Sequence, residues 1–177
     1  SQYDKIIRIS SREEHRVTTV GQIEKKTQAR VVALFRATLG YTYLGDWTER
    51  AGNSNVEEGL LADYLTGAGY SPVQISRALD LLRREAEHHG RSLYDNNKAV
   101  YGLLRFGVSL KTEAGGVNET VHLINWREPE KNHFALAEEV TLHGQHERRP
   151  DIVLYLNGIA IGVLELKNSR VSLGDGI

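Results

Sequence analysis

Three charged residues interrupt a long apolar stretch near the end of the sequence. Asp151 comes directly before one apolar run, and Glu165 and Lys167 close the run that follows an Asn-Gly pair. Strands that are apolar on both faces are typical of the centre of a sheet, where a charge is costly unless it is paired or binds a metal. Two carboxylates and the backbone carbonyl of Leu166 are hard oxygen ligands that suit Mg²⁺. The sequence therefore predicts a metal site formed by Asp151, Glu165 and the Leu166 carbonyl.

The chemistry expected of such a site is hydrolysis of a phosphodiester. A metal held by Asp151 and Glu165 can polarise a phosphate and lower the pKa of a bound water, and Lys167 can orient that water or stabilise the developing charge. Chance is the alternative explanation, because Glu-x-Lys is a common combination in a chain with 23 acidic and 22 basic residues. A Pro-Asp pair at the start of the partner strand favours the functional interpretation.

The pleat of the hairpin places a condition on this site. Side chains alternate between the two faces of a strand, so Asp151 and Glu165 must be brought to one face. A two-residue turn at Asn157-Gly158 would place Asp151 opposite Leu164 and on the other face from Glu165. We therefore predict a loop of odd length with Gly158 in a left-handed conformation, or a bulge elsewhere.

The elements that must position the hairpin are expected to be helices first and strands afterwards. Asn55 followed by Glu58 resembles a capping box, and Ser71-Pro72 with Gln74 gives a second helix start. Helices are expected over residues 20–39, 55–65, 72–88 and 98–106, and strands over residues 107–110, 120–125 and 134–142. This order predicts a mixed α+β (α/β) domain with a central mixed sheet flanked by helices.

Composition narrows the possible classes of protein. With 177 residues and 40% hydrophobic content, the chain is expected to form a single domain over residues 1–177. A formal net charge of −1 means that contact with nucleic acid must rely on local basic patches. The absence of cysteine excludes disulfides and thiolate metal sites and fits a reducing cytoplasm. No apolar run approaches the roughly 20 residues of a membrane span, so no membrane partner is expected.

The hairpin resembles a known family, the N-terminal PD-(D/E)xK nuclease domain of the restriction subunit (HsdR) of type I restriction-modification enzymes. The resemblance is strongest in residues 149–153, 157–159 and 165–168. Weaker similarity extends further back, so that the resemblance covers about the last eighty residues. The resemblance implies a restriction-endonuclease-like fold, and the absence of methionine agrees with a fragment of a longer chain.

The resemblance also implies roles for individual residues. Asp151 and Glu165 would bind Mg²⁺, and Lys167 would be the third catalytic residue. The family uses a further acidic residue on an early helix, for which Glu24 is the positional candidate, although an exposed surface carboxylate is the alternative. Double-stranded DNA would be the substrate, and the modification and specificity subunits would be partners. ATP would bind only to motor domains of the full-length protein, because the sequence has no Walker A loop.

Several charged residues near the hairpin can be interpreted either as part of the site or as solvated surface residues. Arg148 and Arg149 directly precede it and either contact DNA phosphates or are simply solvated. One member of the Glu138-Glu139 pair is a candidate outer carboxylate of the site, with solvent exposure as the alternative. At the level of function, the alternatives to a type I site-specific deoxyribonuclease are another PD-(D/E)xK nuclease, from repair or type III restriction, and a degenerate nuclease fold that serves binding or assembly.

Overall fold

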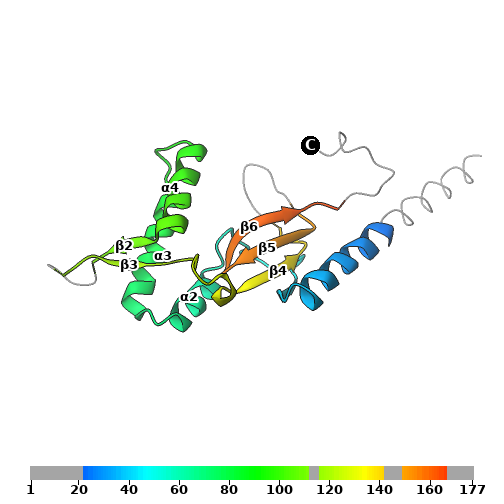
Figure 1. The fold of residues 1–177 in the computed structure, drawn as a ribbon. Helices are drawn as coiled ribbons and strands as arrows, with labels where there is room; N and C mark the ends of the chain where they lie inside the picture. The colour runs from blue at the N-terminus through cyan, green and yellow to red at the C-terminus, as the bar shows by residue number, and fades with distance from the viewer. Residues whose placement is uncertain (1–21, 112–115, 142–148, 167–177) are drawn as a thin grey trace, which may run out of the picture. The chain divides into compact units, whose positions relative to one another are not determined.

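The computed structural model describes residues 22–111, 116–141 and 149–166 (Figure 1). A helix over residues 22–37 comes first. The elements that follow are β1 (Thr42–Asp46), α2 (Glu58–Gly67), α3 (Pro72–Ala86), α4 (Leu93–Phe106), β2 (Val108–Leu110), β3 (Glu119–Val121), the 3-10 helix η1 (Pro129–Lys131), β4 (Phe134–Glu138), β5 (Ile152–Leu156) and β6 (Ile159–Leu164). The sheet has the strand order β1-β4-β5-β6, and β2 pairs with β3 in antiparallel fashion. The predicted mixed α+β class is confirmed.

Internal contacts divide the chain into two compact units. The described residues of the first unit lie within Ser1–Arg50, Leu136–Val153 and Val163–Ile177, and those of the second lie within Ala51–Ala135 and Leu154–Gly162. The expectation of one domain over residues 1–177 stays a prediction. None of the helices in the described ranges is long and apolar enough to cross a membrane.

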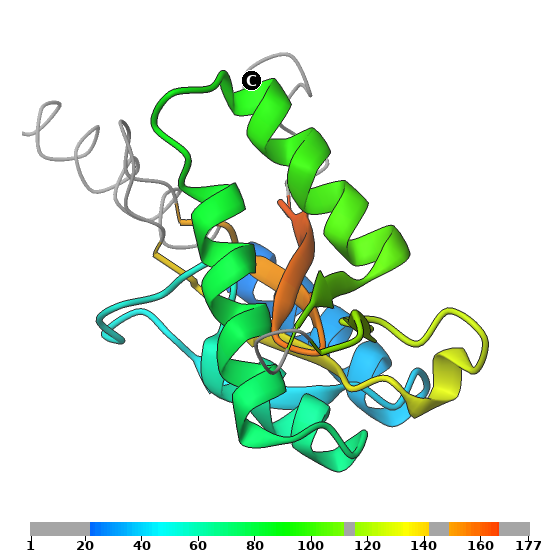
Figure 2. The same cartoon turned by 90° about the vertical axis from the view of Figure 1, so that its left-hand side faces the viewer.

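The second unit is built around α3. This helix packs against α2, α4 and β2, and Figure 2 shows it alongside α4. Its start is the predicted capping box: the Ser71 hydroxyl accepts a hydrogen bond from the Gln74 amide, and the Gln74 side chain accepts one from the Ser71 amide. Val73, in the first turn of α3, is 50% exposed despite its apolar side chain. The buried core cluster of this unit consists of Leu61, Leu65, Ile75, Ala78, Leu82, Val108, Val121, Leu123 and Ile159.

Helix α2 does not begin at the predicted capping box. It starts at Glu58, and the residue before it, Glu57, makes no side-chain cap. The segment ahead of it is engaged elsewhere, because the Glu57 amide donates to the Gly158 carbonyl and the Asn55 carbonyl accepts from the Ala160 amide. Tertiary hydrogen bonds to the hairpin therefore replace the first helical turn that Asn55 and Glu58 would otherwise cap.

The remaining boundaries differ in ways that local contacts explain. Helix α4 begins at Leu93, earlier than expected, because Ser92 caps it by accepting from the Asp95 amide. The strand expected over residues 120–125 ends at Val121. Strand β4 ends at Glu138, because the next residue has a left-handed φ of 53°. Strand β1 has no counterpart among the expected elements.

The turn between β5 and β6 has two residues, so the predicted odd-length loop is wrong. Asn157 and Gly158 both have positive φ values, 52° and 84°. This is the conformation of a tight hairpin turn whose twist matches that of the strands. The alternative of a bulge within the strands stays a prediction.

The two turn residues are held in place by other residues of the second unit, to which they belong. Asn157 is fully buried; its side chain donates to the Leu123 carbonyl and accepts from the His133 amide. A Cβ atom on Gly158 would lie 2.7 Å from the Glu57 carbonyl oxygen, so only glycine fits this approach to the start of α2. The Asn-Gly pair thus serves packing as well as chain reversal.

Candidate functional site

The structure brings the predicted carboxylate residues to one end of the hairpin. Asp151 lies one residue before β5, and Glu165 lies one residue after β6. The backbone N–H of Leu166 donates a 2.6 Å hydrogen bond to Oδ2 of Asp151. The Asp151 carboxylate therefore lies against the peptide that joins Glu165 to Leu166. Asp151 is half-buried, whereas Glu165 is exposed.

The even turn does not by itself separate these two carboxylates. Alternation of side chains between faces holds where strands are paired in a ladder, and Asp151 and Glu165 lie just beyond the paired residues. Along β6 the exposed positions are Ile161 and Val163, and Glu165 continues that spacing. Asp151 meets this segment through a backbone amide, which a side chain can approach from outside the ladder.

The donor chemistry at this end of the hairpin fits a hard divalent cation. The Leu166 amide uses Oδ2 of Asp151, which leaves Oδ1 and the Glu165 carboxylate as oxygen donors. Mg²⁺ commonly binds through one or two carboxylates and keeps several waters, so two carboxylates suffice. Within the described residues no cluster of three or more His, Cys, Asp or Glu side chains is arranged for a metal. The third predicted catalytic residue, Lys167, lies outside the described residues.

A buried glutamine connects the N-terminal helix to Asp151. Gln28 has 8% of its surface exposed. Its side-chain amide donates to Oε2 of Glu138 at 2.7 Å, to Oε1 of Glu139 at 3.3 Å and to the Asp151 carbonyl at 3.4 Å. The Glu139 amide also donates to that carbonyl at 3.0 Å. The backbone of Asp151 is therefore held from two directions.

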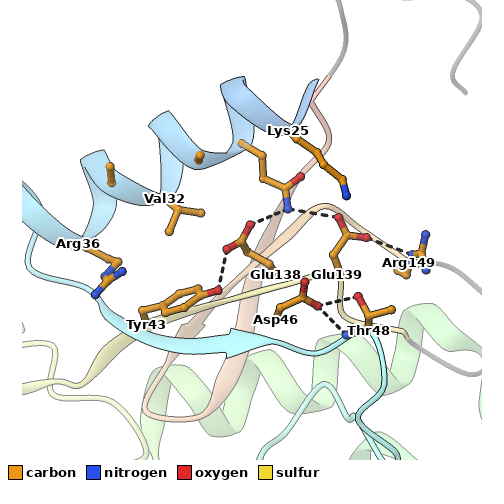
Figure 3. A pocket seen from close by; sticks show the side chains of 12 residues that line it. Lys25, Val32, Arg36, Tyr43, Asp46, Thr48, Glu138, Glu139 and Arg149 are labelled. Atoms are coloured by element: carbon orange, nitrogen blue, oxygen red, sulfur yellow. Dashed lines mark hydrogen bonds and ion pairs between the residues drawn. The ribbon is translucent and has the colours of Figure 1, made fainter. Parts of the chain in front are cut away.

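A cavity of about 630 Å³ opens beside this network (Figure 3). It is lined by Lys25, Gln28, Ala29, Val32, Ala33, Arg36, Tyr43, Asp46, Thr48, Glu138, Glu139 and Arg149. Three lining residues are cationic and three are acidic, so the cavity has no excess of either sign. Its cationic residues are exposed, whereas the two glutamates are half-buried. Asp151 is not part of the lining, but the lining residue Gln28 donates to its carbonyl.

Glu138 and Glu139 both face the helix over residues 22–37 and are not freely solvated (Figure 3). The Tyr43 hydroxyl donates to Oε1 of Glu138 at 2.8 Å. Burial of the phenol, together with this hydrogen bond and the negative charge of Glu138, raises the pKa of Tyr43 to about 12. Thr48 donates two hydrogen bonds to Asp46, which lower the pKa of that carboxyl group.

The other predicted site residues differ in their exposure and in whether the structure describes them. Arg149 is exposed and forms a 3.2 Å ion pair with Oε2 of Glu139. An ion pair at this exposure is weak, so Arg149 remains available to a phosphate. Glu24 is half-buried and lies one helical turn before Gln28, on the helix face that reaches Asp151. Arg148 lies outside the described residues.

Gln28 is the site residue that the sequence did not reveal. Its charged neighbours Lys25, Lys26 and Arg30 suggest an exposed helix face. The available signal was Val32, four residues later and 6% exposed, which shares the buried stripe with Gln28. Apolar residues at Leu34 and Leu39 obscure that stripe, because both are about half exposed, at 51% and 53%.

Comparison with known proteins agrees with the resemblance of the hairpin. The family described as type I restriction enzyme R protein N terminus (HSDR_N) matches residues 21–177. A segment of 79 residues, 41% of this chain, is 34% identical to a protein of Methanocaldococcus jannaschii whose inferred name is type I restriction enzyme MjaIXP endonuclease subunit. The match covers 8% of that relative's length. No solved structure matches the chain.

Proposed function

Because the chain belongs to the type I restriction enzyme R protein N-terminus family, we propose that it is a Mg²⁺-dependent nuclease domain that hydrolyses phosphodiester bonds of double-stranded DNA. Family membership supports a nuclease role in a restriction system. The observation that carries the chemical proposal is the hydrogen bond between the Leu166 amide and the Asp151 carboxylate. It joins the two segments that supply the carboxylates.

The residues have distinct roles in this proposal. Asp151 and Glu165 would hold Mg²⁺, with the Leu166 carbonyl as a further oxygen donor and Glu24 as a candidate fourth group. When bound, the metal supplies polarisation of the scissile phosphate and a bound water of lowered pKa. The Leu166 amide fixes the orientation of Asp151, and Gln28 and the Glu139 amide fix its backbone.

Lys167 and the arginines would act on the substrate. By its place two residues after Glu165, Lys167 is proposed to orient the attacking water or stabilise charge on the phosphate. Arg149 is proposed to contact a DNA phosphate, as is Arg148. Both contacts require only local positive charge, which agrees with the formal net charge of −1.

The activity of the whole protein is part of the same proposal. The chain would act as the nuclease domain of a type I site-specific deoxyribonuclease, together with modification and specificity subunits. Cutting would be coupled to ATP-driven translocation by motor domains elsewhere in the parent protein. ATP would bind to those motor domains and not to residues 1–177.

Plasmid cleavage by the parent complex with Mg²⁺ and ATP tests the proposal. Glu165→Ala and Lys167→Ala are each expected to lower the cleavage rate by at least about 100-fold, the scale seen when a group that stabilises transition-state charge is removed. Glu130→Ala, at an exposed acidic residue of η1, is the matched control and should cut as the wild type does. ATP hydrolysis should be retained in all three variants, which shows that the complex is assembled. Unchanged cutting by Glu165→Ala would contradict the proposal and favour a binding or assembly module.

A further inference from the structure

The second unit contains a pocket that the proposed hydrolysis does not use. Its volume is about 550 Å³. It is lined by Tyr64, Ala68, Tyr70, Arg105, His122, Ile124, Asn125, Trp126 and Arg127. We propose that this pocket binds one nucleotide unit of an unpaired DNA strand, with the phosphate at Arg105 and Arg127 and the base stacked on Trp126. The choice of DNA as the polymer rests on the proposed function.

The charge of the pocket favours an anion. Arg105 and Arg127 are among its lining residues, and no lining residue is acidic. Both arginines are exposed, and neither forms a salt bridge with a carboxylate in the described part of the chain. Guanidinium groups without a carboxylate partner match the geometry of phosphate oxygens. This local excess is notable in a chain with a formal net charge of −1.

Trp126 supplies the surface for a base. Its side chain is 50% exposed, whereas the other tryptophan, Trp47, is 8% exposed. The Trp126 indole N–H donates to the Leu104 carbonyl at 2.8 Å, so its polar atom is satisfied and the ring is held in place. The Arg105 guanidinium carbon lies 5.6 Å from the ring centroid. A fixed, half-exposed ring beside a guanidinium is a suitable platform for a stacked base.

The loop that carries Trp126 and Arg127 is ordered by side-chain hydrogen bonds. Oδ1 of Asn125 accepts from the amides of Arg127 at 3.2 Å and Glu128 at 3.0 Å. The Asn125 backbone is in turn bonded to the Asn132 side chain through both its amide and its carbonyl, at 2.8 and 2.9 Å. The backbone that carries Trp126 and Arg127 is therefore ordered by contacts within the chain itself, which lowers the entropic cost of binding.

An unpaired strand fits this arrangement better than a duplex does. Stacking on Trp126 requires an exposed base face, which a base inside a duplex shares with its neighbours. An acidic peptide would also meet the two arginines but would gain nothing from the tryptophan ring unless it carried an aromatic residue. Dependence of binding on both Trp126 and the arginines therefore identifies the ligand class.

Trp126 fluorescence provides the test. In the chain of residues 1–177, which has two tryptophans, the Trp47→Phe variant leaves Trp126 as the single fluorescent tryptophan. Addition of a single-stranded DNA oligonucleotide, in EDTA to prevent cleavage, should quench this fluorescence in a saturable way. Arg105→Ala and Arg127→Ala should each weaken binding and make the affinity less dependent on salt concentration. Arg84→Ala, at an exposed arginine of α3 outside the pocket, is the matched control and should bind normally.

Fluorescence anisotropy with a labelled oligonucleotide gives an independent readout that keeps Trp47. Trp126→Ala should weaken single-strand binding at least about fivefold, the lower end of the range for loss of one stacked base. A deoxynucleoside monophosphate should quench Trp126 at higher concentration if one nucleotide unit is recognised. Equal affinity for a duplex, or equal binding of a polyglutamate peptide with the same arginine dependence, would overturn the proposal.

The two proposals fail in different ways. Glu165→Ala should abolish plasmid cutting without changing oligonucleotide quenching of Trp126. If Glu165→Ala loses cutting, but DNA leaves the Trp126 fluorescence of the Trp47→Phe chain unaltered, only the nucleotide pocket is overturned. Normal cutting in Glu165→Ala together with arginine-dependent quenching would overturn only the assignment of the hairpin carboxylates.

Discussion

The backbone N–H of Leu166 and Oδ2 of Asp151 share a 2.6 Å hydrogen bond across the open end of the β5–β6 hairpin. Hydrogen bonds to a charged acceptor are stronger than those between neutral groups. The Asn157-Gly158 turn closes the hairpin at its other end. The Asp151 carboxylate thus has a structural role that can be separated from its proposed metal chemistry, because a neutral carbonyl oxygen can also accept this bond.

Asp151→Asn and Asp151→Ala should separate the two roles. The asparagine keeps an acceptor oxygen for the Leu166 amide, so it should lower the free energy of unfolding by less than about 1 kcal/mol. The alanine removes the acceptor, so its cost should be about 1.5–3 kcal/mol, the range for a hydrogen bond to a charged group. Both should abolish cleavage by the parent complex. Chemical denaturation measures the first effect, and equal destabilisation by the two variants would show that the hydrogen bond adds little.

Features specified by neighbouring residues were predictable from the sequence. The start of α3 is an example, because Ser71 and Gln74 exchange both capping hydrogen bonds within one turn. The same kind of signal failed at Asn55, where the backbone bonds to the hairpin instead of opening a helix. A helix-capping preference is worth only about 1 kcal/mol. It is therefore overridden where tertiary hydrogen bonds compete for the same backbone groups.

In the candidate site, too, features set by neighbouring residues were predictable and features set by distant contacts were not. The types of Asp151 and Glu165, charged residues beside apolar strands, are visible in the sequence, and the structure joins their segments. The even turn was not predicted, because the argument from side-chain alternation took Asp151 and Glu165 to lie within the paired strands, whereas both lie just beyond them. Gln28 was not predicted because its glutamate partners lie 110 and 111 residues further along the chain.

Gly158→Ala should destabilise the chain strongly. The residue has a φ of 84°, and the added Cβ would lie 2.7 Å from the Glu57 carbonyl oxygen and 2.8 Å from Cβ of Leu60. A positive φ alone costs about 1–3 kcal/mol for a residue with a side chain, and the overlap adds to it. Gly162→Ala in β6 is the matched control, because its nearest neighbour would be 4.0 Å away. Thermal unfolding of both variants checks this, and a loss for Gly162→Ala as large as that for Gly158→Ala would contradict it.

Gln28→Glu should destabilise the first unit in a manner that depends on pH. The introduced carboxylate would face Glu138 and Glu139 without the amide hydrogens that now bind them. Burial and like charge would raise its pKa above the unfolded value of about 4.3. The penalty is therefore small below that pH, where the protonated carboxyl can donate, and grows as the pH rises through the folded pKa.

The expected loss for Gln28→Glu at neutral pH is about 3 kcal/mol, the scale for one uncompensated buried charge. Gln28→Ala is the comparison variant, because it removes the donor without adding a titrating group. Its loss should therefore change less between pH 4 and pH 7, as measured by chemical denaturation at both values. Parallel pH profiles for the two variants would show that the introduced charge is relieved by solvent.

Tyr43 should titrate late, with a pKa of about 12, because its phenol is partly buried and donates to Glu138. The folded state then holds the phenolic proton more tightly than the unfolded chain, in which tyrosine titrates near about 10. This contribution to stability is complete below pH 10 and is lost as the pH rises from there toward 12. Tyrosinate absorbance of the wild type minus that of Tyr43→Phe isolates one of eight tyrosines. The difference should have its midpoint near pH 12 in the folded chain and near pH 10 in denaturant, and coincident midpoints would rule out the hydrogen bond to Glu138.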